Sequence, residues 1–122
     1  MANLAPVPDS LTDEQVLMCP DIMSTGFGGA ESGAIQIGDT VAIFAQGPIG
    51  LCATAGARLK GATRIIAVET VPERIAVAKR MGADIVVDFG KADPVEEILK
   101  ITEGRGVDVS IEALGLPQTF EA

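Results

Sequence analysis

The stretch that decides the fold is TVAIFAQGPIG, residues 40–50. Its apolar first half predicts a buried strand over 40–45. The glycine-containing second half opens a run of small residues that predicts a helix over about 48–59. A second apolar run predicts a strand over 64–69 that ends in Glu69, 19 residues after Gly50. Strand, glycine turn, helix, strand and acid in this order form one half of a dinucleotide-binding fold.

The chemistry of such a turn lies in its backbone. Glycine lets the main chain approach a pyrophosphate, whose charge is stabilised by the unpaired amides at the N-terminus of the following helix. An acid at the end of the second strand can accept hydrogen bonds from an adenosine ribose. Ala45 replaces the first glycine of the usual triplet, so a tight turn without a ligand is the simplest alternative. The strand, the small-residue helix and the acid together favour nucleotide binding.

Length and composition favour a single domain with an aliphatic core. The 122 residues are 48% apolar but only 3% aromatic, which suits parallel strands buried under helices. No apolar stretch approaches the length of a membrane span, and no signal peptide is visible. Cys19 and Cys52 lack the spacing of a metal cluster, and we interpret them as reduced thiols of a cytoplasmic protein.

The charge of the chain is uneven. Nine basic residues against seventeen acidic ones give a net charge of −8, and the first basic residue is Arg58. A polyanion would find no electrostatic contact before that residue, so nucleic-acid binding is disfavoured. The sequence contains no histidine. Catalysis by a histidine base, or zinc held by several imidazoles, is therefore impossible from this chain alone.

Strands and helices alternate from residue 40 onward. The pattern predicts further strands over 85–88 and 107–112, with helices over about 71–81 and from Asp93 to Gly104. Thr70 and Glu73 have capping-box spacing at the start of the first of these helices. Such alternation implies parallel strands joined by right-handed crossovers, and we expect strand order 3-2-1-4. The predicted fold class is α/β, a truncated doubly wound parallel sheet of about four strands.

A helical pattern precedes the sheet. It begins at Thr12, which is a suitable cap, and continues to about Gly33, with a break or bend expected near Pro20. Glycines at 26, 28 and 29 weaken the second part of this pattern. Residues 1–11 have two prolines and no clear periodicity, which is typical of a connecting segment.

Four stretches together resemble the cofactor domain of zinc-dependent medium-chain alcohol dehydrogenases. They are residues 38–50, residues 72–74 leading to 81–84, residues 102–108 and residues 111–115. Upstream, PDIMSTGF at 20–27 is similar to the interdomain helix of the bacterial secondary-alcohol branch. The resemblance implies a Rossmann-type sheet. It also implies a connecting segment with the interdomain helix at 1–37 and a partial dinucleotide-binding domain at 38–122.

The resemblance also implies roles for individual residues. The pyrophosphate turn would be Gly47, Pro48, Ile49 and Gly50, with Ile49 also packing near the nicotinamide. Thr25 would lie beside the nicotinamide ring, Glu69 would hold the adenosine ribose, and Arg74 would support the same ribose. The cofactor cleft would be lined by Ala113, Leu114 and Gly115. Asp21 would be the third catalytic zinc ligand.

Several of these residues have simpler interpretations. Asp21 could cap a helix after Pro20, and Thr25 could bond to its own helix backbone. Arg74 could be a solvated helix charge, and residues 113–115 could be an ordinary strand exit. Glu69 is the firmest assignment, because an acid that closes a buried strand needs partners.

The family binds zinc with a Cys and a His as well, on a separate substrate domain that this sequence does not contain. One carboxylate cannot hold a catalytic zinc, which needs about three protein ligands. We therefore predict no catalytic residue in this chain and no activity from it alone. Zinc and an alcohol or ketone substrate would belong to the complete enzyme. The open edge of the fourth strand predicts self-association into a homo-oligomer.

NAD is the expected cofactor. In the secondary-alcohol branch, enzymes that use NADP replace the acid with small residues and an arginine, whereas this chain has Glu69. A carboxylate facing the 2′-phosphate of NADP is repelled by about 1–4 kcal/mol at ~4 Å. Two alternatives remain. One is a non-catalytic NAD-binding module, and the other is a fragment of a methyltransferase that binds S-adenosylmethionine, against which Pro48 in the turn argues.

Overall fold

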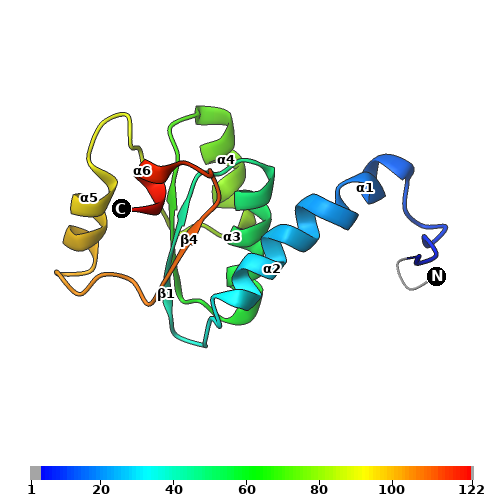
Figure 1. The fold of residues 1–122 in the computed structure, drawn as a ribbon, viewed down its shortest axis with the longest axis horizontal. Coiled ribbons are helices and arrows are strands. Elements are labelled where there is room, and N and C mark those ends of the chain that lie inside the picture. The colour runs from blue at the N-terminus through cyan, green and yellow to red at the C-terminus, as the bar shows by residue number, and fades with distance from the viewer. Residues whose placement is uncertain (1–3, 122) are drawn as a thin grey trace.

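The computed structural model describes residues 4–121 and contains one parallel sheet (Figure 1). Its strands are β1 Thr40–Phe44, β2 Arg64–Val68, β3 Ile85–Val87 and β4 Val109–Glu112. They lie in the order β3-β2-β1-β4, and every pair is parallel. The predicted α/β class and strand order 3-2-1-4 are confirmed.

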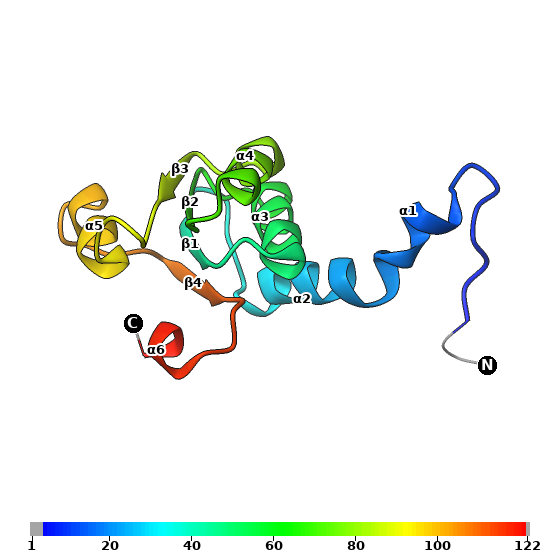
Figure 2. The same ribbon diagram turned by 90° about the horizontal axis from the view of Figure 1, so that it is seen from above.

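Helices cover both faces of this sheet. They are α1 Asp13–Leu17, a π-helical turn at Cys19–Met23, α2 Ser24–Ser32, α3 Pro48–Lys60, α4 Pro72–Met81, α5 Pro94–Ile101 and α6 Pro117–Phe120. Seen from above, α3 and α4 lie on one face, and α5 lies on the other (Figure 2). The crossover from β1 to β2 therefore uses one face and the crossover from β3 to β4 uses the other. This is the doubly wound arrangement.

The core follows from the alternation of side chains along β1, which is buried throughout. Val41 and Ile43 pack with alanines of α3, whereas Ala42 and Phe44 pack with Ile98 of α5. A strand buried on both faces is expected to be apolar along its length, and β1 is apolar from Val41 to Phe44. Its neighbours are in register: Phe44 is paired with Val68 of β2 and with Glu112 of β4. The carboxyl ends of the three strands therefore meet at one edge.

The N-terminal helical segment departs from α-helical geometry near Pro20, where the sequence predicted a break or bend. Pro20 has no N–H and cannot continue an α-helix from the preceding turn. The chain instead makes a π-helical turn, in which the Met23 N–H donates to the Met18 carbonyl at 2.9 Å. The Thr12 cap is confirmed as a capping box, because the Gln15 N–H donates to Thr12 Oγ1 and the Thr12 N–H donates to Gln15 Oε1.

Gly26 of α2 serves the packing of this helix, and α2 forms over Ser24–Ser32 despite its three glycines. A Cβ at Gly26 would lie 2.4 Å from Cys52 Cβ and 2.7 Å from the Ile49 carbonyl oxygen. A Cβ at Gly56 of α3 would lie 2.7 Å from the ring of Phe27. Only glycine allows the two helix backbones to approach this closely. The expectation that the cluster weakens this helix left out the contact of Gly26 with α3, whereas a Cβ at Gly28 would have no described atom within 4 Å.

The capping box predicted at Thr70 and Glu73 is wrong. Helix α4 begins with Pro72, and its N-cap is Val71, whose side chain cannot accept a hydrogen bond. The backbone N–H groups of Thr70 and Val71, just before the helix, donate to Glu69 Oε1 at 2.8 and 3.1 Å. The Glu69 carboxylate therefore accepts the hydrogen bonds of the N–H groups that precede α4, in place of the predicted capping box.

Among residues 4–121, no helix combines the length and apolar character needed to cross a bilayer.

Candidate functional site

The candidate site lies at the carboxyl edge of the sheet, where β1, β2 and β4 end together. In open α/β sheets, ligands bind outside the carboxyl ends of the strands, at the point where the crossovers change faces. Here that point lies between β1 and β4, because the chain leaves β1 toward β2 on one side and reaches β4 on the other. Three segments meet there: the turn 45–50, residues 69–74 after β2, and residues 113–116 after β4.

The turn 45–50 bends sharply because its backbone leaves the strand in a left-handed conformation. Ala45 has φ +69°, and its N–H donates to the Val68 carbonyl at 2.9 Å. A Cβ at Gly50 would lie 2.0 Å from the Ala45 carbonyl oxygen, so only glycine fits at that position. A Cβ at Gly47 would have no described atom within 4 Å. The turn is therefore tight against its own helix but open on the side where a ligand would approach.

Helix α3 presents its N-terminus at this opening. Gly47 is the N-cap and Pro48 the first helical residue, so among residues 4–121 no capping side chain satisfies the N–H groups of Ile49 and Gly50 in the first turn. The positive end of the helix dipole lies at the same place. Unpaired amides without an overlying side chain form an anion-binding surface of the kind that holds a pyrophosphate.

Glu69 is buried at the edge of this turn, with only 3% of its surface exposed. Its Oε2 accepts from the Gln46 N–H at 3.0 Å, and its Oε1 accepts from the N–H groups of Thr70 and Val71. Arg74 Nη1 lies 3.6 Å from Oε2. Burial raises the pKa of Glu69, but these three N–H donors and Arg74 outweigh it and lower that pKa below its ordinary value. The carboxylate is ionised at neutral pH.

This arrangement limits what Glu69 can offer a ribose. An ionised carboxylate has about four acceptor positions, and backbone N–H groups occupy three of them. The remaining position is on Oε2, which accepts only one of the three N–H groups. Glu69 can therefore accept one hydroxyl directly without giving up a backbone bond. The side chain of Arg74 is half-exposed, and its guanidinium lies beside the same oxygen, Oε2.

The hydrogen bonds of Glu69 make stability depend on pH. A carboxylate with a lowered folded-state pKa stabilises the fold above the unfolded pKa, and this contribution is lost as pH falls through the folded-state value. We expect the free energy of unfolding to decrease as pH falls below the ordinary glutamate value of 4.5. We also expect the free energy of unfolding of the Glu69→Gln chain to decrease less over the same pH range. Urea unfolding at several pH values measures both slopes.

Other carboxylates provide the internal control for that measurement. Asp88, Asp108 and Glu112 also have a lowered pKa, so the Glu69→Gln chain should keep part of the acid dependence. Equal slopes in the two chains would contradict a role of the Glu69 carboxylate in stability.

The loop after β4 is held by a second carboxylate, which sequence reasoning missed. Glu112 Oε1 accepts from the N–H groups of Leu114 and Gly115 at 2.7 and 2.9 Å and from Thr119 Oγ1 at 2.8 Å. This fixes Leu114, which is 47% exposed, at the wall of a hollow of about 330 Å³. The ends of β1 and β2, the start of α5 and the loop after β4 line this hollow. Its volume is at the lower end of the range of ligand pockets.

Comparison with known proteins shows the family of this chain. Residues 48–122 match the family model described as zinc-binding dehydrogenase. The chain belongs to this family. It is 68% identical over 120 residues to an alcohol dehydrogenase of Cupriavidus necator, covering 98% of this chain and 33% of that enzyme. It is 48% identical over 114 residues to an NADP-dependent isopropanol dehydrogenase of Thermoanaerobacter brockii, covering 93% of this chain and 32% of that enzyme.

Solved structures of the dehydrogenase family share the fold. Alcohol dehydrogenase TADH from Thermus sp. ATN1 superposes with a TM-score of 0.88 at 34% identity, covering 96% of this chain and 34% of that one. A benzyl alcohol dehydrogenase from Acinetobacter calcoaceticus superposes with a TM-score of 0.86 at 30% identity, covering 93% of this chain and 32% of that one. The chain spans about one third of the length of its relatives. The family resemblance expected from the sequence is confirmed.

The resemblance to dehydrogenases implies that Asp21 is a zinc ligand and that Thr25 lies beside the nicotinamide. In the structure they lie one helical turn apart, and Thr25 Oγ1 donates to Asp21 Oδ1 at 3.1 Å. The residue after Thr25, Gly26, packs against the Ile49 carbonyl, so Thr25 is close to the first turn of α3. Both side chains are exposed.

A catalytic zinc cannot be held by this set of residues. Among residues 4–121, no three His, Cys, Asp or Glu side chains gather in a way that could bind a metal ion. Asp21 supplies one carboxylate where about three protein ligands are needed. The residues present therefore do not fit the zinc of the dehydrogenase family by themselves.

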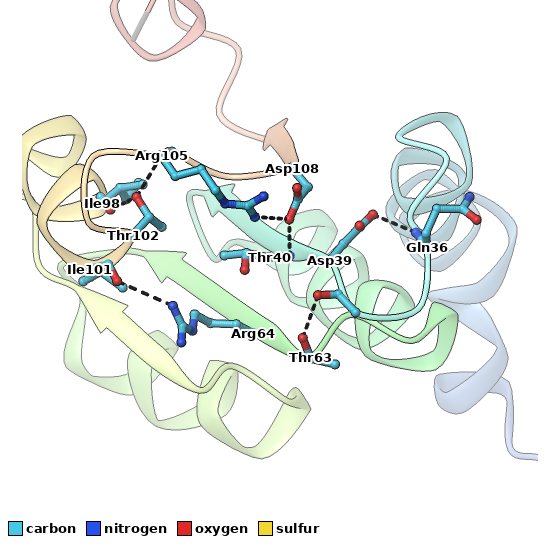
Figure 3. Close-up of polar contacts among 12 residues, drawn as sticks. Gln36, Asp39, Thr40, Thr63, Arg64, Ile98, Ile101, Thr102, Arg105 and Asp108 are labelled. Carbon is cyan, nitrogen blue, oxygen red and sulfur yellow. Dashed lines mark hydrogen bonds and ion pairs between the residues drawn. The ribbon is translucent and has the colours of Figure 1, made fainter.

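A larger hollow, of about 660 Å³, lies at the opposite edge of the sheet. Most of its polar groups bond to one another (Figure 3). Asp108 Oδ2 accepts from Arg105 Nη2 at 2.7 Å and from the Thr40 N–H at 2.8 Å, and Arg64 Nη1 reaches the Ile101 carbonyl at 3.5 Å. It lies at the amino ends of the strands, away from the unpaired amides of α3. We therefore assign the candidate site to the smaller hollow and the turn beside it.

Proposed function

We propose that this chain is the nicotinamide-dinucleotide-binding part of an alcohol dehydrogenase that transfers hydride between an alcohol and NAD. The observation that carries the proposal is the juxtaposition of an open turn, whose Gly50 allows no side chain, with an ionised and buried Glu69. One provides amides for a pyrophosphate and the other an acceptor for a ribose. We also propose the division into a connecting and interdomain segment at 1–37 and a partial dinucleotide-binding domain at 38–122.

The role of this chain in such an enzyme is to hold and orient the nicotinamide. Residues Gly47, Pro48, Ile49 and Gly50 would carry the pyrophosphate, and Ile49 and Thr25 would contact the nicotinamide end. Residues Ala113, Leu114 and Gly115, after β4, would line the cofactor cleft, and Leu114 also lines the hollow described above. Asp21 would contribute one zinc ligand to the complete enzyme. In that enzyme zinc would supply a Lewis acid for the alcohol oxygen, and this chain by itself would be inactive.

NAD is proposed over NADP because of the environment of Glu69. Burial among three N–H donors keeps the carboxylate ionised and prevents it from turning away from an incoming 2′-phosphate. Related enzymes include NADP-dependent ones by name, so the family alone does not decide the cofactor. The electrostatic argument favours NAD by about five-fold to a thousand-fold.

Two further proposals concern the state of the protein. Among the described residues, β4 pairs only with β1, and its open edge supports self-association into a homo-oligomer. Cys19 and Cys52 are free thiols, which supports a cytoplasmic location.

Calorimetric titration tests the proposed function directly. We expect NADH to bind the unchanged chain and to raise its melting temperature, with weaker binding of NADPH. Titration with S-adenosylmethionine provides the control for the methyltransferase alternative, and it should give neither heat nor a melting shift. Absence of any NADH response at millimolar concentration would contradict the proposal, and tighter NADPH binding would contradict the choice of NAD.

A further inference from the structure

We propose that Gln46 is a positioning residue that holds the backbone of the turn 45–50 in the conformation that binds a pyrophosphate. Its buried side chain accepts a hydrogen bond from Thr54 of α3. The inference rests on the proposed function and names the group that fixes the pyrophosphate turn. Neither the glycine pattern nor the resemblance assigns a role to either residue.

Gln46 is an unusual residue for its place. It follows a strand that is apolar from Val41 to Phe44, and both Gln46 and Thr54 have 0% of their surface exposed. A buried amide lowers stability unless its donors and acceptor are satisfied. Here Thr54 Oγ1 donates to Gln46 Oε1 at 2.8 Å, and Gln46 Nε2 donates to the carbonyls of Ile43 and Ala45 at 3.3 and 3.2 Å. Every polar group of the side chain has a partner.

These partners are the parts of the turn that most need support. Ala45 is in the left-handed region at φ +69°, which a residue with a Cβ adopts only when its surroundings hold it there. The Ala45 carbonyl that Gln46 Nε2 bonds is the atom against which Gly50 packs. Through Oε1, the same side chain is tied to the second turn of α3. Gln46 thus connects the end of β1, the strained residue and the helix that would receive the pyrophosphate.

Gln46 also connects the turn to the ribose acid. Its N–H donates to Glu69 Oε2 at 3.0 Å, across 23 residues of sequence. A change in the position of Gln46 would therefore move both the phosphate amides and the single acceptor position left on Glu69. A residue that only filled the core would affect stability without this selective effect on the ligand.

The test replaces Thr54 by valine, which keeps the shape of the side chain and removes the hydroxyl. Gln46 Oε1 then has no donor in a buried position, and we expect the affinity for NADH to fall by about ten-fold. Thr54→Ser, which restores the hydroxyl, should return the affinity to that of the unchanged chain. Thr102→Val is the matched control, because Thr102 is also buried but bonds the Ile98 carbonyl in α5.

A second readout needs no ligand. The backbone N–H of Gln46 is protected from exchange by its hydrogen bond to Glu69. Its hydrogen should exchange at least about ten-fold faster in Thr54→Val than in Thr102→Val or Thr54→Ser. Unchanged exchange, together with NADH affinity equal to that of Thr102→Val, would overturn the inference. If the unchanged chain bound no NADH, the proposed function would fail, and the exchange of the Gln46 amide would still decide whether Thr54 positions the turn.

Discussion

Replacing Gly50 by alanine is expected to abolish measurable NADH binding and to lower the free energy of unfolding by about 3 kcal/mol or more. The new Cβ would lie 2.0 Å from the Ala45 carbonyl oxygen, a backbone atom that cannot rotate away. Relief requires the whole turn to shift, and that shift would break the bond between the Gln46 N–H and Glu69. Urea unfolding and calorimetry measure the two effects.

Gly47→Ala is the matched control for this prediction. Gly47 has φ −69°, which any residue adopts, and its Cβ would have no described atom within 4 Å. We expect unchanged stability but weaker NADH binding, because the methyl group would stand where the pyrophosphate approaches. An unfolding midpoint for Gly50→Ala equal to that of Gly47→Ala would show that the close contact does not constrain the turn.

Glu69→Ser is expected to reduce the preference for NADH over NADPH by about five-fold to a thousand-fold. The substitution removes the charge that repels a 2′-phosphate and leaves the half-exposed Arg74 without its partner. NADH affinity should also fall, because three N–H groups lose their acceptor. The ratio of the two dissociation constants is therefore the informative quantity, and paired titrations of the same preparation measure it.

Glu73→Ser provides the control for net charge. Glu73 lies in the first turn of α4 and is exposed, so its loss changes the total charge equally without touching the site. The ratio of its dissociation constants for NADH and NADPH should equal that of the unchanged chain. An equal change of the ratio in both variants would attribute the preference to overall charge, not to the position of Glu69.

Much of the site was predictable because it depends on local sequence. The glycine turn, the acid after β2 and the exit of β4 were placed from spacing and family resemblance, and the structure brings these segments to one edge. Gln46, Thr54 and Glu112 were missed. The available signal was a glutamine directly after a strand with no other polar residue in its interior. Without knowing which atoms lie within reach of its amide, that signal could not be interpreted.

The sequence by itself determined the elements and their order, because the periodicity of apolar residues, the positions of Gly and Pro, and the handedness of crossovers act over short distances. Only the tertiary structure decided which polar groups meet. The pairing of Phe44 with Val68 brings the Gln46 N–H to Glu69, and this made a carboxylate, not Thr70, the cap of the segment before α4. Hydrogen-bond partners 23 residues apart depend on strand register to within one residue, and that precision exists only once the sheet has formed.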